Sequence, residues 1–114
     1  MALINNTTSV NGVDAPLFWK ITAIRWDLMK YGRNVNLEIS AYVSPMQCRA
    51  DLDRNSRKLG IQEYMFPADD ISAVSEEYMY MAIKTIPEFE NAVDCLDWKD
   101  WDIDRWYLYI NSLK

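Results

Sequence analysis

Residues 35–43 alternate between hydrophobic and polar types, which predicts a β-strand with one buried and one wet face. Residues 17–27 are rich in aromatic and β-branched side chains and contain no Gly or Pro, so they also indicate a strand. Between them, the polar segment 30–34 contains a Gly and predicts a turn. We therefore expect an antiparallel hairpin built from two long strands.

The central part of the chain predicts a third strand and one main helix. Residues 60–66 have the composition of a strand, which the following proline ends. Residues 71–86 show helical spacing after a pair of aspartates, which are N-cap types, and a proline stops the helix. The stripe predicted to face the sheet consists of Ile71, Val74, Tyr78, Met81 and Thr85, widened by Ala82 and Ile86. Residues 46–59 are charged and predict a loop or a short helix.

The two ends of the chain predict less regular structure. Residues 1–16 are rich in Asn and Thr and indicate an extended N-terminal arm. Residues 96–114 form an aromatic and acidic C-terminal extension, in which residues 105–110 alternate as in a short strand. The compact domain covers residues 17–95. The predicted fold class is α+β: an antiparallel β-meander of about three strands, with an optional fourth from the tail, packed against one main α-helix.

The net charge of −5 is unevenly distributed along the chain. Residues 1–60 contain eight Lys and Arg against five Asp and Glu, whereas residues 61–114 contain four against twelve. An acidic surface repels nucleic-acid phosphates, so no nucleic-acid partner is expected. The opposite charges of the two halves suit head-to-tail contact between copies, and they equally suit an ordinary solvated face. No apolar stretch approaches the roughly 20 residues that span a bilayer, so no membrane partner is expected either.

The residue types needed for common enzyme chemistry are missing from the sequence. There is no His, which excludes the usual nucleophilic triads and removes the commonest metal ligand. The three Gly are dispersed, so they form no phosphate-binding loop. Cys48 and Cys95 are expected to be free, packed thiols, since no CxxC pair occurs. We expect no catalytic residues, no cofactor and no metal.

Two acidic patterns offer weak alternatives to this expectation. Glu76 with Glu77, or Glu88 with Glu90, could supply the paired carboxylates of a glycosidase. The first pair is adjacent on a predicted helix and cannot converge on one point, and the second is typical of surface charge. Residues 100–104 match the opening of a calcium loop, but the match fails where Arg and Asn replace the required Gly and the closing acid.

A dense aromatic cluster in the C-terminal extension is the candidate interface. Its members are Trp98, Trp101, Trp106, Tyr107 and Tyr109. Five large rings interleaved with Asp exceed what one small core needs, and aromatic anchors with a charged rim are typical of protein contact surfaces. A saccharide-binding platform uses the same residue types, and a core role explains two or three of the rings.

The sequence around residues 77–95 resembles a signature of small phage-encoded proteins. Residues 84–89 read Lys-Thr-Ile-Pro-Glu-Phe after a predicted helix that carries Tyr, and an Asp-Cys pair follows at residues 94–95. In that family, a helix runs into Lys-Thr-Leu-Pro-Glu-Phe and then into an Asp-Cys ending. The order of the predicted elements before this run is similar too. Residues 46–59 and 96–114 depart from the compact form of the family.

The resemblance implies a non-enzymatic structural component of a bacteriophage virion. The expected protein is a small multi-copy tail, baseplate or fibre-attachment subunit, whose partners are other virion structural proteins and copies of itself. It would be made in the bacterial host cytoplasm and located in the virion. The alternatives are a small independent binding module for a saccharide or a host protein, and a head decoration protein.

Overall fold

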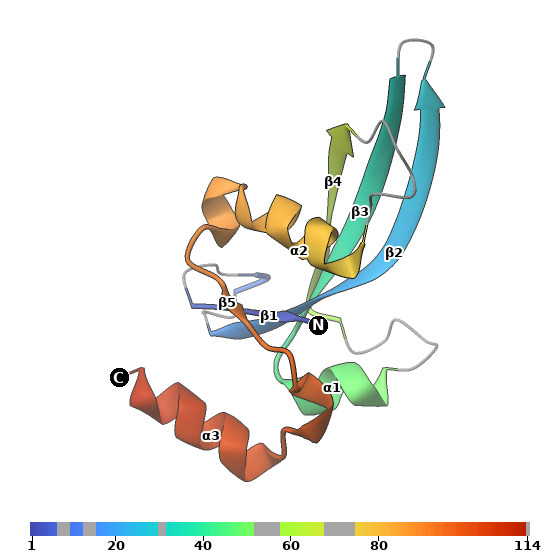
Figure 1. The fold of residues 1–114 in the computed structure, drawn as a ribbon. Coiled ribbons are helices and arrows are strands. Elements are labelled where there is room, and N and C mark those ends of the chain that lie inside the picture. Colours follow the sequence, from blue (N-terminus) through green and yellow to red (C-terminus); the bar gives the residue numbers. More distant parts are fainter. Residues whose placement is uncertain (7–9, 13–15, 30–31, 52–57, 68–74, 114) are drawn as a thin grey trace.

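The computed structural model describes residues 1–6, 10–12, 16–29, 32–51, 58–67 and 75–113. Its strands are β1 (Leu3–Asn5), β2 (Leu17–Met29), β3 (Gly32–Tyr42), β4 (Gly60–Pro67) and β5 (Val93–Asp94). Its helices are α1 (Pro45–Ala50), α2 (Glu76–Lys84) and α3 (Ile103–Ser112), with the short 3-10 helices η2 (Pro87–Phe89) and η3 (Trp98–Asp100). Figure 1 shows α2 across one face of the sheet, and α1 and α3 at the end remote from the tip of the β2–β3 hairpin.

The described strands form one antiparallel sheet in the order β4-β3-β2-β1-β5. β2, β3 and β4 are the predicted meander, and the predicted α+β class is confirmed. Among the described residues, the tail contributes no fourth strand. The sheet is instead extended beyond β2 by β1 and β5, which come from the two ends of the chain.

Strand β1 lies in the interior of the sheet, so the prediction of an extended arm over residues 1–16 is wrong for residues 3–5. All three strand residues pair with β2, and the first two also pair with β5. Ala2 and Cys95 continue this pairing through backbone hydrogen bonds of 3.2 and 2.8 Å. The apolar run 2–4 is too short to stand out from its Asn- and Thr-rich surroundings. Pairing on both edges nevertheless satisfies its backbone groups, and burial of its side chains stabilises it.

A β-bulge explains why the sequence of β2 lacks a single alternation. The register of β2 against β3 shifts between Ile21 and Ala23, so Thr22 is the extra residue. Before the bulge, the residues of β2 that face α2 have odd numbers. Beyond it, Ile24 and Trp26 take that side. One inserted residue reverses which positions point inward, and a pattern with a period of two cannot show this.

Helix α2 begins later than the sequence predicts. The hydroxyl of Ser75 accepts a hydrogen bond from the backbone N of Tyr78 at 3.1 Å, which satisfies a free N–H of the first turn. The helix therefore starts at Glu76, and residues 71–74 of the prediction lie outside the described part of the chain.

The face of α2 that packs on the sheet also differs from the predicted stripe. The buried residues of the helix are Met79, Tyr80 and Ile83. By contrast, Tyr78 and Met81 of the predicted stripe are 41% and 62% exposed. The sequence Tyr-Met-Tyr-Met puts apolar side chains around the whole turn, so their spacing does not select one face. The hydroxyl of Tyr80 finds a partner on β2, and this contact belongs to the observed face.

The opposite face of the sheet is covered at one end by α1, η3 and α3. The buried residues of this second core are Ala2, Ile4, Phe18, Tyr42, Cys48, Cys95, Trp98, Trp101 and Trp106. Helix α1 begins after Ser44, whose hydroxyl accepts a hydrogen bond from Gln47 N at 3.3 Å. It realises the short-helix alternative for residues 46–59, of which 52–57 lie outside the described part. The sheet therefore separates two hydrophobic cores.

The tail forms helix α3, so the predicted strand over residues 105–110 is wrong. Asp102 caps the helix by accepting a hydrogen bond from Arg105 N at 2.8 Å. Trp106 is 2% exposed, whereas Leu108, which an alternating strand would bury with it, is 72% exposed. The residues that pack with Trp106 follow it by three and four positions, which is the spacing of a helix.

Replacing the ring that joins α3 to the sheet tests this packing. Trp106→Ala should lower the free energy of unfolding by about 3–5 kcal/mol, because it leaves a cavity in the second core. Leu108→Ala on the same helix should change it by no more than about 0.5 kcal/mol. Urea titrations followed by far-UV circular dichroism give both values. Equal effects of the two substitutions would show that α3 does not pack against the sheet.

Candidate functional site

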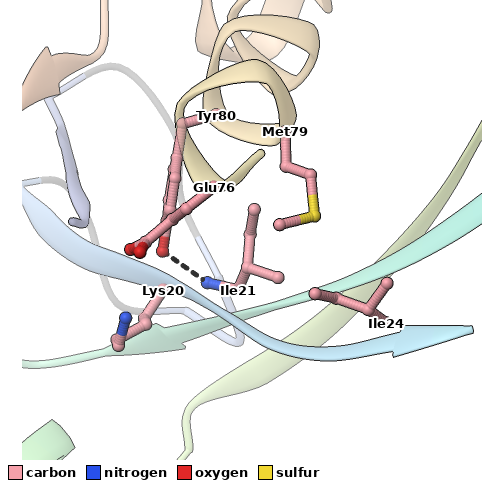
Figure 2. A pocket seen from close by; sticks show the side chains of 6 residues that line it. All are labelled: Lys20, Ile21, Ile24, Glu76, Met79 and Tyr80. Carbon is pink, nitrogen blue, oxygen red and sulfur yellow. Dashed lines mark hydrogen bonds between the residues drawn. The ribbon is translucent and has the colours of Figure 1, made fainter. Parts of the chain in front are cut away.

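A pocket of about 210 Å³ lies between α2 and β2, where β2 continues past its pairing with Leu3 at the start of β1. Its lining residues are Lys20, Ile21, Ile24, Glu76, Met79 and Tyr80 (Figure 2). Figure 2 shows the Tyr80 side chain reaching from the helix to β2, where its hydroxyl accepts a hydrogen bond from Ile21 N at 3.0 Å. This contact satisfies a backbone donor at the edge of the sheet, where an unpaired group would otherwise be available to another strand.

The charged groups of this pocket are also bound within the fold. Lys20 Nζ donates to the carbonyl of Met1 at 3.1 Å and lies 5.0 Å from the centre of the Trp98 ring. Glu76 Oε1 lies 2.8 Å from the amino group of Met1. Burial lowers the pKa of Lys20, and the hydrogen bond from the Met1 amino group lowers the pKa of Glu76. The contacts of these lining residues thus hold Met1 and α2 against β2, which is a structural role.

The structure brings the predicted aromatic cluster together but places its three tryptophans in the second core. Trp98, Trp101 and Trp106 are 8%, 8% and 2% exposed. The ring centroid of Trp101 lies 6.1 Å from that of Trp106 and 5.7 Å from that of Tyr109. The three tryptophans therefore take the core role that the sequence allowed for two or three of the rings, rather than an exposed contact surface, because the turns of α3 and η3 direct them inward. Tyr107 does project from α3, with 56% of its side chain exposed.

Polar contacts fix the turn that leads into α3. Arg49 Nη1 donates to the carbonyl of Trp98 at 2.8 Å. Asp97 accepts a hydrogen bond from Trp101 Nε1 at 3.0 Å and pairs with Arg105 at 2.8 Å. The hydrogen bond from Trp101, followed by that from Arg105, lowers the pKa of Asp97. These contacts orient the tryptophans towards the sheet.

The acidic patterns of the sequence take up structural contacts. Asp102, which lies within the calcium-like run, caps α3. Glu88 Oε2 accepts a hydrogen bond from the hydroxyl of Tyr64 at 3.4 Å, and Glu76 pairs with Met1. Within the described part of the chain, no three Cys, Asp or Glu side chains are grouped so that they could hold a metal ion.

An apolar groove of about 360 Å³ lies between α3 and the adjoining ends of β2, β3 and α1. Its apolar lining includes Pro16, Val43, Met46, Ile103, Tyr107 and Ile110. Val43, Ile103 and Tyr107 are 48%, 52% and 56% exposed. Half-exposed apolar side chains gathered around one concave surface make this groove a candidate interaction site. Two members of the predicted interface, Trp106 and Tyr107, lie here.

The outer edge of β4 is a second candidate contact surface. Val10 lies against Gly60 at the start of the strand. Beyond that point, no described strand pairs with the outer side of β4, which is the last strand of the sheet. Ile61 and Met65 are 50% and 53% exposed, and Glu63 is the only charged residue of the strand. The backbone and side chains of β4 can therefore accept a neighbouring strand.

Neither the groove nor the β4 edge stands out in the sequence. The groove joins residues that are about 60 positions apart, such as Val43 and Ile103, and only the fold brings them together. For β4, a weak signal exists: Ile61 and Met65 share one strand face with Glu63, which marks that face as partly wet.

Both cysteines are free and buried in the second core. Burial raises the pKa of each thiol to about 11. Thiolates are the reactive form of cysteine, so both side chains serve packing in the folded chain.

The cysteine thiols predict a pH dependence of reactivity and stability. At pH 8, a disulfide-exchange reagent should label native protein far more slowly than urea-unfolded protein, because burial limits access and disfavours the thiolate. The folded pKa values lie above the ordinary value of 9.0, so their contribution to stability is complete below about pH 9 and is lost as the pH rises towards 11. Labelling of the variants Cys48→Ser and Cys95→Ser shows which labelling rate belongs to which thiol. Native labelling at the unfolded rate would contradict the buried positions.

No protein-family model, curated protein or solved structure matches the chain. None of the described helices is both long and apolar enough to span a membrane.

Proposed function

We propose that the protein is a non-enzymatic structural component of a bacteriophage virion: a small, multi-copy tail, baseplate or fibre-attachment subunit. Its proposed partners are other virion structural proteins and copies of itself. It would be made in the bacterial host cytoplasm and located in the virion. The resemblance of residues 77–95 to small phage-encoded proteins supports a location in the virion. The outer edge of β4, which no described strand covers, supports a role in assembly.

The edge of β4 is the observation that carries the assembly role. Monomeric proteins commonly protect a long edge strand with Lys, an internal Pro or a bulge. Residues 61–66 contain no Lys or Pro, and β4 keeps an unbroken register with β3. A neighbouring strand that paired here would gain backbone hydrogen bonds and would cover the exposed side chains of Ile61 and Met65.

Quantitative mass spectrometry of purified particles tests the virion location. The particles should come from the phage that encodes the protein and should be purified through a density gradient. We expect several copies per particle, in a fixed ratio to the tail proteins. Abundant protein in infected cells together with none in intact particles would contradict the proposal.

Two matched methionine substitutions test the role of the β4 edge. Met65→Lys adds a charge beside the open edge, and Met81→Lys adds the same charge at a position on α2 that is 62% exposed. We expect the first variant to lose most of its incorporation into particles and the second to be incorporated normally, because Lys opposes edge-to-edge pairing. Thermal unfolding checks that both variants fold. Normal incorporation of folded Met65→Lys protein would contradict a role of the β4 edge in assembly.

A further inference from the structure

The groove beside α3 has an apolar surface that the described residues leave uncovered. Buried Leu17 and Trp106 contribute to its lining, together with half-exposed Val43, Ile103 and Tyr107. Its volume of about 360 Å³ lies at the lower end of the range for small-molecule sites. A cavity of this size accommodates a large apolar side chain.

The apolar surface of α3 is wider than the part that packs on the body of the protein. Trp106 lies in the second core, and Tyr109 and Ile110 pack against that core. Ile103 and Tyr107, one helical turn apart, line the groove and remain half exposed. An amphipathic helix of a globular protein normally faces its apolar stripe to a core. Within the described part of the chain, this part of the stripe of α3 therefore lacks a cover.

The first turn of α3, which contributes Ile103 to the groove, and the residues just before it are acidic. Exposed aspartates here are Asp100, Asp102 and Asp104. None of the three forms an ion pair with another described residue. The nearby cation Arg105 is already paired with Asp97 at 2.8 Å. Asp104 lies three residues before Tyr107, so the two side chains are neighbours on the helix surface.

We propose that the groove binds a segment of a neighbouring virion protein that carries an apolar side chain flanked by Lys or Arg. The apolar side chain fills the groove against Ile103 and Tyr107, and the basic residues pair with Asp100 and Asp104. A second copy of this chain, whose residues 1–60 carry eight Lys and Arg against five Asp and Glu, is the other occupant that the experiment below distinguishes. The identity of the neighbour rests on the proposed function, whereas the chemistry of the groove does not.

Affinity selection from a random twelve-residue peptide library tests the chemistry of the partner. The full chain is immobilised, and the enriched sequences are read. We expect enrichment of peptides with a large apolar residue between basic residues. Failure to enrich any sequence, enrichment of acidic or uncharged sequences, or enrichment of sequences that match this chain would overturn the proposal.

Matched variants then locate the binding of the most enriched peptide, measured by fluorescence polarisation. The double variant Ile103→Ser with Tyr107→Ser should raise the Kd at least about tenfold, as the loss of central apolar anchors does. Leu108→Ser, on the outer side of the same helix and 72% exposed, is the control and should leave the Kd unchanged. An unchanged Kd for the folded double variant would remove the groove as the site.

A second pair of variants tests the acidic surroundings. Asp100→Asn with Asp104→Asn should raise the Kd several-fold and flatten its dependence on salt, because screened charge pairs are lost. The exposed Glu90→Gln, away from α3, should do neither. An equal effect of both changes would mean that only the overall charge matters, and would contradict specific pairing at the groove.

The two proposals fail separately. Peptide binding at the groove by a protein that is absent from particles would reject the virion role and keep the groove. A protein that is present in particles but whose groove selects no basic and apolar peptide would keep the virion role and reject the groove.

Discussion

The pairing of β1 between β2 and β5 is the contact on which the rest of the structure depends. Leu3 enters the core under α2, while Ala2 and Ile4 enter the core on the other face, so one short strand joins both. Among the described strands, β5 pairs with β1 alone, and the turn that carries Trp98 follows β5 directly. Hydrogen bonds on both edges offset the desolvation of the β1 backbone, and burial of its apolar side chains stabilises the arrangement.

A sheet with apolar residues on both faces needs a cover on each. Helix α2 covers one face, and α1, η3 and α3 cover one end of the other (Figure 1). This second cover explains the many tryptophans, since Trp98, Trp101 and Trp106 fill it. Among the described residues, this second cover leaves a groove beside α3, and no strand pairs with the outer side of β4. The proposed contacts with neighbours would extend the sheet at β4 and fill the groove beside α3.

The sequence predicts the meander well because successive side chains of β3 and β4 alternate between a more buried and a more exposed face of the sheet. It fails for β1 because three buried residues carry no periodicity, and their burial depends on partners far along the chain. It fails for the tail because Trp106 and Leu108 fit a strand as well as a helix until packing separates them. The composition of the aromatic cluster fits a hydrophobic core and a protein interface equally well, since both use large apolar rings. Residues such as Val43 and Ile103, which form the groove, meet only in three dimensions.

Amide hydrogen exchange of β1 tests the central claim most directly. If β1 is an interior strand, the amides of Leu3 and Ile4 in the isolated protein should exchange as slowly as those in the middle of β2 and β3. Trp19 on β2 and Ile39 on β3 are suitable reference amides, because both residues are completely buried. Exchange of the Leu3 and Ile4 amides at the rate of an unstructured peptide, with the reference amides still protected, would contradict the account. The N-terminal residues would then be an arm that orders only on a neighbour.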